Sequence, residues 1–239
     1  KKPAEFATFN DFFARAIKVD KYRPLDHADD ETVVVSPADC RLMCFNSILD
    51  STKFWVKGNQ FTVENMCGAN TSIDYNKYMG GSFVIARLAP QDYHRWHWPI
   101  GGKVKQIEHI DGALYSVNPI VVNKPLNVYT DNKRAVVEID SEDEKIGGYL
   151  MFVIAATLVG SYKLFQCDGE NPGEDEAVPL EVGSVVKRGD LSGEFRFGGS
   201  TILLLFEPNK VKFDDDIVRN VTKKFETLVK ARMRIGRIQ

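Results

Sequence analysis

The chain has 239 residues, and its 31 Lys+Arg against 33 Asp+Glu give a formal net charge of −2. With 44% hydrophobic and 27% charged residues, the composition is that of a globular protein and excludes a disordered, collagen-like or coiled-coil chain. The near-neutral charge predicts no nucleic-acid partner, because nucleic-acid binders usually carry a strong basic excess. The length is sufficient to bury a large core, and we predict a single domain over residues 1–239.

No segment has the sequence of a membrane span or a signal peptide. The longest apolar run, Tyr149–Val159, is shorter than the roughly 20 residues that a bilayer requires. The N-terminus continues into an amphipathic stretch rather than the apolar centre of a signal peptide. We therefore expect an intracellular protein. None of the cysteines forms a Cys-x-x-Cys pair, so we expect buried, reduced thiols at Cys40, Cys44, Cys67 and Cys167.

Aromatic residues near the N-terminus follow a helical period. Phe6, Phe9, Phe13 and Ile17 are spaced by three or four positions, which predicts a helix with one apolar face. That face can pack on the core of the protein, or it can lie in a membrane interface with its phenyl rings in the bilayer. Of the two interpretations, packing on the core is the one we favour.

From residue 32 onward the chain is typical of short β-strands separated by turns. Val, Ile, Leu and Phe dominate these segments, and Gly, Pro, Asn or Asp punctuates most of them. The predicted strands are Thr32–Ser36, Arg41–Ile48, Ser82–Leu88, Lys103–Ile110, Asn127–Thr130, Arg134–Ile139 and Thr201–Phe206. We predict an α+β, mostly β fold: a compact barrel or sandwich-like core, similar to a hybrid barrel, with a helix flanking it at each end.

The C-terminal part of the chain supplies the second helix and two loops. Residues 214–216 are acidic and precede apolar positions at helical spacing as far as Val229, which predicts a helix that stops by Gly236. Val182–Asp190 places two glycines six residues apart, as in the hairpins of small barrels that carry lipoyl or biotinyl groups. Residues 167–177 are acidic and contain Gly and Pro, which predicts a surface loop.

Two of the four histidines lie in one short segment. His94 and His97 are three residues apart, and with a carboxylate such a pair could bind zinc. The segment lacks the Glu of a His-Glu-x-x-His motif and has no third histidine nearby, so we predict no metal site. The plain structural alternative is two packed or surface histidines in an aromatic loop.

Two further segments complete a set of residue types found in nucleophilic catalysis. Gly198-Gly199 permits strained backbone angles just before Ser200, and this segment leads directly into an apolar strand. Asp39 follows a strand that we expect to be buried, where a carboxylate needs a partner. Asp39, His97 and Ser200 supply the types of a Ser–His–Asp relay, although ordinary turns would explain the glycines and Asp39 as well.

Six motifs, in order over nearly the whole chain, resemble those of the phosphatidylserine decarboxylase family. They are Ser36–Asp39 (SPAD), Leu88–His97 (LAPQDYHRWH), Tyr115–Pro119 (YSVNP), Val159–Ser161 (VGS), Val186–Asp190 (VKRGD) and Phe197–Thr201 (FGGST). Segments similar to the eukaryotic-type branch of that family are Phe6–Ala14 (FATFNDFFA), Phe54–Val56, Lys57-Gly58 and Phe61.

The resemblance implies a precursor that cuts itself. Ser200 Oγ would attack the Gly199 carbonyl, with His97 as the base and Asp39 orienting His97. The products would be a β chain of residues 1–199 and an α chain of residues 200–239.

The resemblance also implies the cofactor and the acid of the mature enzyme. The α chain would begin with a covalent pyruvoyl group derived from Ser200, an electron sink that makes pyridoxal phosphate and metal unnecessary. His94 would reprotonate the substrate carbon after CO2 has left. The chain departs from the family pattern at Cys40, Gly198, Trp96 and Trp98, and the two indoles could shape a pocket for an aromatic amino acid.

From the resemblance we predict a carbon–carbon lyase that converts phosphatidylserine to phosphatidylethanolamine at an anionic membrane surface. The alternatives are the same scaffold acting on a free amino acid such as tryptophan, and a non-catalytic barrel module that binds or carries a group. Residues 200–239 hold nine basic against five acidic residues, which suits anionic lipid. We expect peripheral association with a membrane, an endomembrane being favoured, and a homodimer stays open.

Overall fold

The computed structural model describes residues 2–54, 61–122, 126–141, 145–157, 161–166, 178–197 and 201–239. Its helices, with 3₁₀ helices written η, are η1 (Pro3–Glu5), α1 (Phe9–Phe13), α2 (Val19–Tyr22), α3 (Ile48–Phe54), α4 (Val63–Cys67), η2 (Tyr75–Tyr78), α5 (Pro119–Val122), α6 (Val128–Asp131) and α7 (Asp215–Thr222). Its strands are β1 (Val33–Val35), β2 (Cys40–Phe45), β3 (Phe83–Arg87), β4 (Arg95–His97), β5 (Gly102–Ile110), β6 (Arg134–Asp140), β7 (Tyr149–Ile154), β8 (Tyr162–Gln166), β9 (Val178–Pro179), β10 (Val185–Val186), β11 (Leu191–Phe195), β12 (Thr201–Phe206), β13 (Val211–Phe213), β14 (Thr227–Val229) and β15 (Arg234–Ile238).

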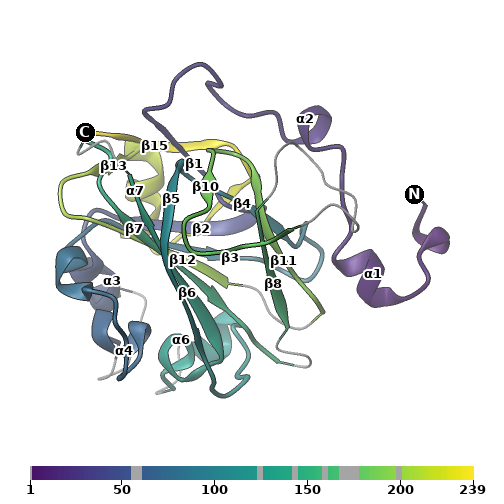
Figure 1. The fold of residues 1–239 in the computed structure, drawn as a ribbon, viewed down its shortest axis with the longest axis horizontal. Helices are drawn as coiled ribbons and strands as arrows, with labels where there is room; N and C mark the ends of the chain where they lie inside the picture. Colours follow the sequence, from purple (N-terminus) through teal and green to yellow (C-terminus); the bar gives the residue numbers. More distant parts are fainter. Residues whose placement is uncertain are drawn as a thin grey trace.

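These strands form three sheets of antiparallel pairs (Figure 1). The largest sheet has the order β10-β5-β6-β7-β12-β3-β2-β14, the second β4-β11-β8-β9 and the third β1-β15-β13. The prediction of a mostly β fold is therefore confirmed, and six of the seven predicted strands are present with small differences at their ends. Among the described residues, no helix is long and apolar enough to span a bilayer.

Strand β12 lies in the middle of the large sheet. Every residue of Thr201–Phe206 is buried, and the strand pairs with β3 on one side and β7 on the other. Leu204 belongs to a core shared with the tryptophans of the β4 region, whereas Leu203 belongs to a second core beneath α3 and α4. Burial of one such leucine contributes about 1.5–3 kcal/mol, so β12 is held firmly from its first residue.

The C-terminal helix ends earlier than its apolar period predicts. Helix α7 stops at Thr222, Lys224 adopts a left-handed conformation with φ of 64°, and the chain continues as β14 and β15. Phe225 and Leu228, which the pattern assigned to the buried helix face, are each 63% exposed. Pairing of β14 with β2 outweighs the local helical pattern here, so the prediction of a C-terminal flanking helix is wrong beyond Thr222.

Two other local predictions are also corrected. Residues 127–130 were expected as a strand, but α6 makes one helical turn there, closed by the Thr130 and Asp131 N–H groups donating to the Asn127 carbonyl. The hairpin predicted in Val182–Asp190 does not form, because β10 pairs with β5 and the chain then enters another sheet. A short apolar run cannot by itself distinguish a helical turn from a strand.

The N-terminal helix is shorter than predicted. Helix α1 begins after Thr8, whose hydroxyl accepts from the Asp11 N–H at 3.1 Å while the Asp11 carboxylate accepts from the Thr8 N–H at 3.1 Å. This reciprocal capping fixes the first turn. Figure 1 shows α1 projecting at the side of the molecule, next to the sheet that contains β8 and β11.

Three of the four cysteines are described, and Cys40, Cys44 and Cys67 are buried and free of disulfide bonds, as expected. Burial raises the pKa of the Cys67 thiol to about 12. The acidic segment 167–177, which includes Cys167, lies outside the described residues.

Candidate active site

Strand β4 brings three of the sequence motifs together. The His97 N–H donates to the Pro37 carbonyl at 2.7 Å, and the Trp98 N–H donates to the Asp190 carbonyl at 2.9 Å. On its other side β4 pairs with β11, with His97 opposite Leu191. The SPAD, LAPQDYHRWH and VKRGD motifs, far apart in the sequence, therefore meet around one histidine.

The ring of His97 is buried and oriented by a backbone carbonyl. Its Nδ1 lies 2.9 Å from the Gly189 carbonyl oxygen. Because a carbonyl oxygen only accepts, Nδ1 carries the proton and Nε2 carries the free lone pair. Gly189 has φ of 85°, a conformation that favours glycine, and so the turn that presents this carbonyl depends on that residue.

Burial also keeps His97 neutral. It lowers the pKa of His97 to about 4, although the hydrogen bond to Gly189 opposes this shift. The Nε2 atom is buried without a hydrogen-bond partner among the described residues. A neutral imidazole with an unprotonated, unoccupied Nε2 is suited to act as a base.

The ring of His94 has different neighbours. Its Nδ1 lies 2.9 Å from the Asp92 carbonyl oxygen, and its Nε2 is buried without a partner in the described part of the chain. The centroid of its ring lies 3.7 Å from that of the Phe13 ring. Burial lowers the pKa of His94 to about 4. The two histidines are thus both neutral but have different neighbours.

Asp39 does not orient His97 through a direct hydrogen bond, contrary to the expectation. Its two carboxylate oxygens accept from Arg23 at 2.6 and 2.5 Å, and Oδ1 also accepts from the Ala231 N–H at 3.0 Å. The Lys230 ammonium lies 3.4 Å away. Burial opposes ionisation of Asp39, but these hydrogen bonds outweigh it and keep the pKa of the carboxyl below its usual range.

The charge of Asp39 nevertheless acts on His97. The carboxylate is close enough to raise the pKa of that imidazole, against the larger effect of burial.

The role of the Gly189 carbonyl could have been suspected from the glycine turn in the VKRGD motif. Nothing in the sequence pattern pointed to Arg23.

Several buried polar side-chain atoms have no hydrogen-bond partner among the described residues, and the two histidines are among them. Buried polar groups in folded proteins are normally hydrogen-bonded, and each exception needs an explanation. Within the described ranges, the unpartnered atoms of residues 93–97 and of strands β11 and β12 include Tyr93 Oη, His94 Nε2, Trp96 Nε1, His97 Nε2, Ser192 Oγ and Thr201 Oγ1.

Gly199 and Ser200 lie outside the described residues, but their flanks do not. Phe197 packs edge-on against Phe9 and Phe13 at centroid distances of 5.0 and 5.2 Å, and Phe13 is the residue that stacks on His94. Thr201 opens β12, between Arg87 and Ile154.

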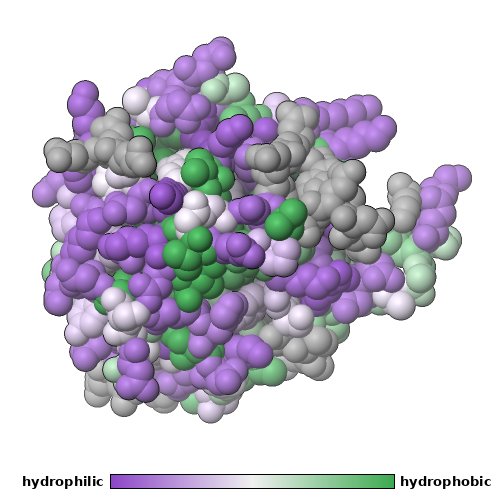
Figure 2. All heavy atoms as spheres, viewed as in Figure 1, coloured by the Kyte–Doolittle hydropathy of each residue, from purple (hydrophilic) through white to green (hydrophobic). Residues whose placement is uncertain are grey.

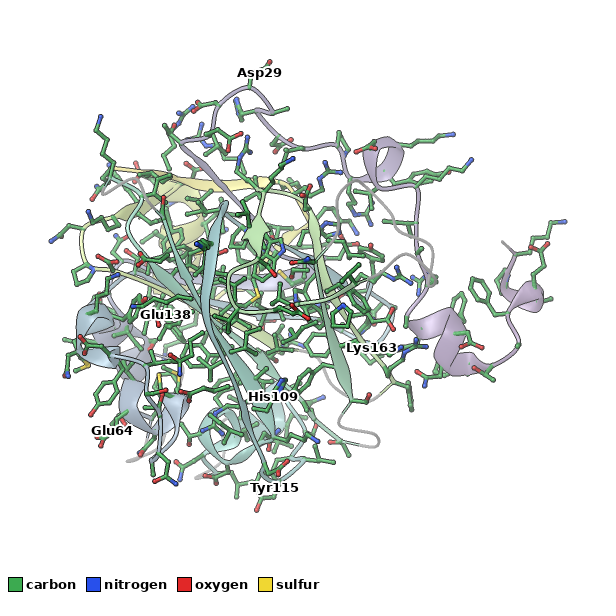
Figure 3. The ribbon with its side chains drawn as sticks, viewed as in Figure 1. Asp29, Glu64, His109, Tyr115, Glu138 and Lys163 are labelled. Carbon is green, nitrogen blue, oxygen red and sulfur yellow. The ribbon has the colours of Figure 1, made fainter. Side chains whose placement is uncertain are left out.

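The two remaining motifs are linked to the chain just beyond strands β7 and β11. The Asn132 side chain donates to the carbonyls of Tyr115 and Ala155, both at 2.8 Å, and so links the YSVNP motif to the chain just beyond β7. Figure 3 places Tyr115 at the end of the molecule opposite Asp29. Of the VGS motif only Ser161 is described, and its carbonyl accepts from the Arg196 N–H at 3.0 Å.

The described side chains contain no group of three His, Cys, Asp or Glu arranged to hold a metal ion.

A family model for phosphatidylserine decarboxylase matches residues 9–237 of the chain. The chain belongs to the phosphatidylserine decarboxylase family. Among curated relatives, it is 40% identical to phosphatidylserine decarboxylase proenzyme 3 of Schizosaccharomyces pombe over 231 residues, 97% of this chain. It is 42% identical to proenzyme 2 of Oryza sativa subsp. japonica over 238 residues and 40% identical to the proenzyme of Fusobacterium nucleatum over 230 residues, 99% and 96% of this chain.

The chain spans only part of some family members. It covers 22% of the length of the fungal relative and 35% of the plant relative, but 70% of the bacterial one. The matched region holds all six sequence motifs, since the family model extends from residue 9 to residue 237.

The neutral histidines predict a specific loss of stability in acid. The pKa values of His94 and His97 are about 4 in the folded protein, against 6.5 for a free histidine. Between these values the unfolded chain binds protons and the folded protein does not, so the free energy of unfolding falls as the pH drops from about 6.5 to 4. Denaturant unfolding at pH 7 and pH 5 measures this loss.

The double variant His94→Gln/His97→Gln should lose less stability between the two pH values than the wild type does. His109→Gln, at an exposed histidine, serves as the control and should keep the full loss. An equal loss in all three proteins would show that the buried histidines do not titrate as described.

Proposed function

We propose that the chain is a self-processing, pyruvoyl-dependent decarboxylase that converts phosphatidylserine to phosphatidylethanolamine and CO2. One observation carries the proposal. Two buried, neutral histidines with unoccupied Nε2 atoms lie three residues apart in a chain of this family, and one of them, His94, is linked through Phe13 to Phe197, which precedes the Gly199–Ser200 bond. The word proenzyme in the relatives' names also supports a precursor that is processed.

The proposed cut begins with an acyl shift. His97 Nε2 accepts the proton of the Ser200 hydroxyl as Oγ attacks the Gly199 carbonyl carbon, and the same proton passes to the leaving Ser200 nitrogen as the peptide C–N bond breaks. The product is an ester. Loss of the Ser200 Cα proton then expels the Gly199 carboxylate, and hydrolysis by one water releases ammonia and leaves the pyruvoyl group.

In this scheme Asp39 supports His97 electrostatically. The imidazole becomes positively charged only while it holds the serine proton, and the Asp39 carboxylate favours that charged state. The Gly189 carbonyl keeps the ring in the required orientation.

The two proposed chains, 1–199 and 200–239, remain bound to one another without the peptide bond. Strand β12 pairs with β3 and β7, β14 pairs with β2, and β15 pairs with β1. Three of the four described strands of the shorter chain therefore form ladders with the longer one, and the fourth, β13, pairs with β15, so the two chains stay assembled after the cut.

In the mature enzyme, the pyruvoyl carbonyl supplies the electron sink that decarboxylation of an amino acid requires. His94 then delivers a proton to the substrate carbon from Nε2. The phosphate and carboxylate of the bound substrate raise the pKa of His94, because nearby negative charge favours the imidazolium. Substrate binding thus loads the acid that the free, neutral ring lacks.

We propose that α1 contacts the membrane that holds the substrate. Phe13 is buried against His94, in agreement with the packing interpretation, but Phe9 on the same helix is 61% exposed. A phospholipid headgroup reaches the site while its acyl chains stay in the bilayer, so an apolar residue close to His94 belongs at that interface.

A free aromatic amino acid is less well supported as the substrate. That alternative depended on two indoles lining a pocket, yet Trp98 is packed in the core with 1% of its surface exposed. Trp96 packs on Phe195 at a centroid distance of 4.5 Å.

Ser200→Ala and His97→Ala are predicted to keep the chain whole. The first removes the attacking hydroxyl and the second removes its base, whereas His109→Ala, a control at an exposed histidine, leaves cleavage intact. A denaturing gel of the purified proteins gives the result. Cleavage at residue 199 in the Ser200→Ala variant would refute the mechanism. Normal cleavage of both variants would refute the roles that the family resemblance assigns to Ser200 and His97.

His94→Ala is predicted to cut normally but to turn over at least about 100-fold more slowly, the usual minimum effect of losing a general acid. The assay measures CO2 release from phosphatidylserine vesicles per mole of processed chain, and the processed chain is counted by its reactive pyruvoyl carbonyl. In the wild type, free tryptophan should give no product. An uncut His94→Ala protein would contradict the separation of roles, and product from tryptophan alone would exclude the lipid substrate.

Phe9→Ser is predicted to weaken binding of the processed enzyme to phosphatidylserine vesicles by about tenfold, as expected for one phenyl side chain leaving the bilayer. Phe225→Ser is the matched control, because Phe225 is similarly exposed, at 63%, but follows α7 and does not belong to α1. Vesicle flotation measures both. Equal binding of Phe9→Ser and wild type would remove α1 from the membrane contact.

A further inference from the structure

Helix α1 contacts the segment that precedes the proposed cut. Asn10 Oδ1 accepts a hydrogen bond from the Phe197 main-chain N–H at 2.8 Å. The rings of Phe9 and Phe13 pack on the Phe197 ring from the same helix. Phe197 follows the last residue of β11 by two positions, so its N–H takes a side-chain acceptor after the strand has ended.

The helix that carries Asn10 is fixed at both of its ends. The reciprocal hydrogen bonds of Thr8 and Asp11 cap its start. At its other end, the Ala14 carbonyl accepts from Arg95 Nε at 2.9 Å, and buried Arg95 forms an ion pair with buried Glu194 at 3.3 Å. Asn10 therefore lies on a short helix that is held at both ends, at Thr8 and at Ala14.

We propose that Asn10 is a positioning residue for the self-cleavage, an inference that rests on the function proposed above. The scissile segment has two anchors, Phe197 on Asn10 and Thr201 in the central sheet. The glycines between them have wide conformational freedom, and attack requires Ser200 Oγ to meet the Gly199 carbonyl in one geometry.

Fixing both ends of so short a segment reduces the conformations that it can sample. Loss of one anchor lowers the fraction of molecules that are ready for attack, while the catalytic groups themselves stay unchanged. The role of Asn10 ends once the bond is cut. This predicts an effect on processing that is absent from turnover, which general destabilisation of the site would not give.

The test compares two substitutions of nearly equal size. Asn10→Leu removes the acceptor and should slow cleavage roughly tenfold, the equivalent of one lost hydrogen bond. Asn10→Asp keeps an oxygen in place and should cut at close to the wild-type rate. Asn76→Leu, at an exposed position in η2, controls for the same change elsewhere. Pulse-labelled synthesis followed by gel analysis gives the fraction cut against time.

The second measurement is turnover per reactive carbonyl in fully processed enzyme, which should match the wild type within about twofold for both variants. Asn10→Leu cutting at the wild-type rate would overturn the proposal, as would Asn10→Asp being equally slow. So would turnover that falls together with cleavage. If Asn10→Leu does not fold, Asn10→Ala replaces it. Absence of cleavage in the wild type would instead refute the proposed function.

Discussion

The exclusion of water from two imidazole rings is the constraint on which the rest of the site depends. His94 and His97 each use Nδ1 on a backbone carbonyl and leave Nε2 buried and unpartnered. Burial lowers both pKa values to about 4, so both rings are neutral at physiological pH without help from an acidic residue. Such atoms cost stability, since a buried polar group forgoes its hydrogen bonds to water. The proton transfers that we propose for these atoms would account for that cost.

The architecture around the rings holds them within a packed core of sheets. Figure 2 shows a mostly hydrophilic face with a hydrophobic patch over β5 and β6, and the cores lie on both sides of the large sheet beneath it. Packing constrains the site at close range as well. A Cβ on Gly193 would lie 2.3 Å from the Trp96 ring, so the glycine in β11 allows the indole to pack beside the histidines.

Much of this could be predicted from the sequence, because the motifs are local and the chemistry needs particular residue types. The strand Thr201–Phe206 was predicted with its observed ends, since a continuous apolar run in a central strand leaves little ambiguity. The pairing of Asp39 with Arg23 could not be predicted, because the two residues are brought together only by the tertiary fold. The same holds for β14, because residues with a helical apolar pattern form a strand there by pairing with β2.

The account depends most on the claim that the chain cuts itself at one bond and converts Ser200 into a new terminus. The intact mass of the purified wild-type protein under denaturing conditions tests this directly. We predict two chains, residues 1–199 and a fragment of residues 200–239 that is lighter than the unmodified peptide by one ammonia. A single uncut chain, or a fragment that retains an unmodified serine at its terminus, would contradict the account.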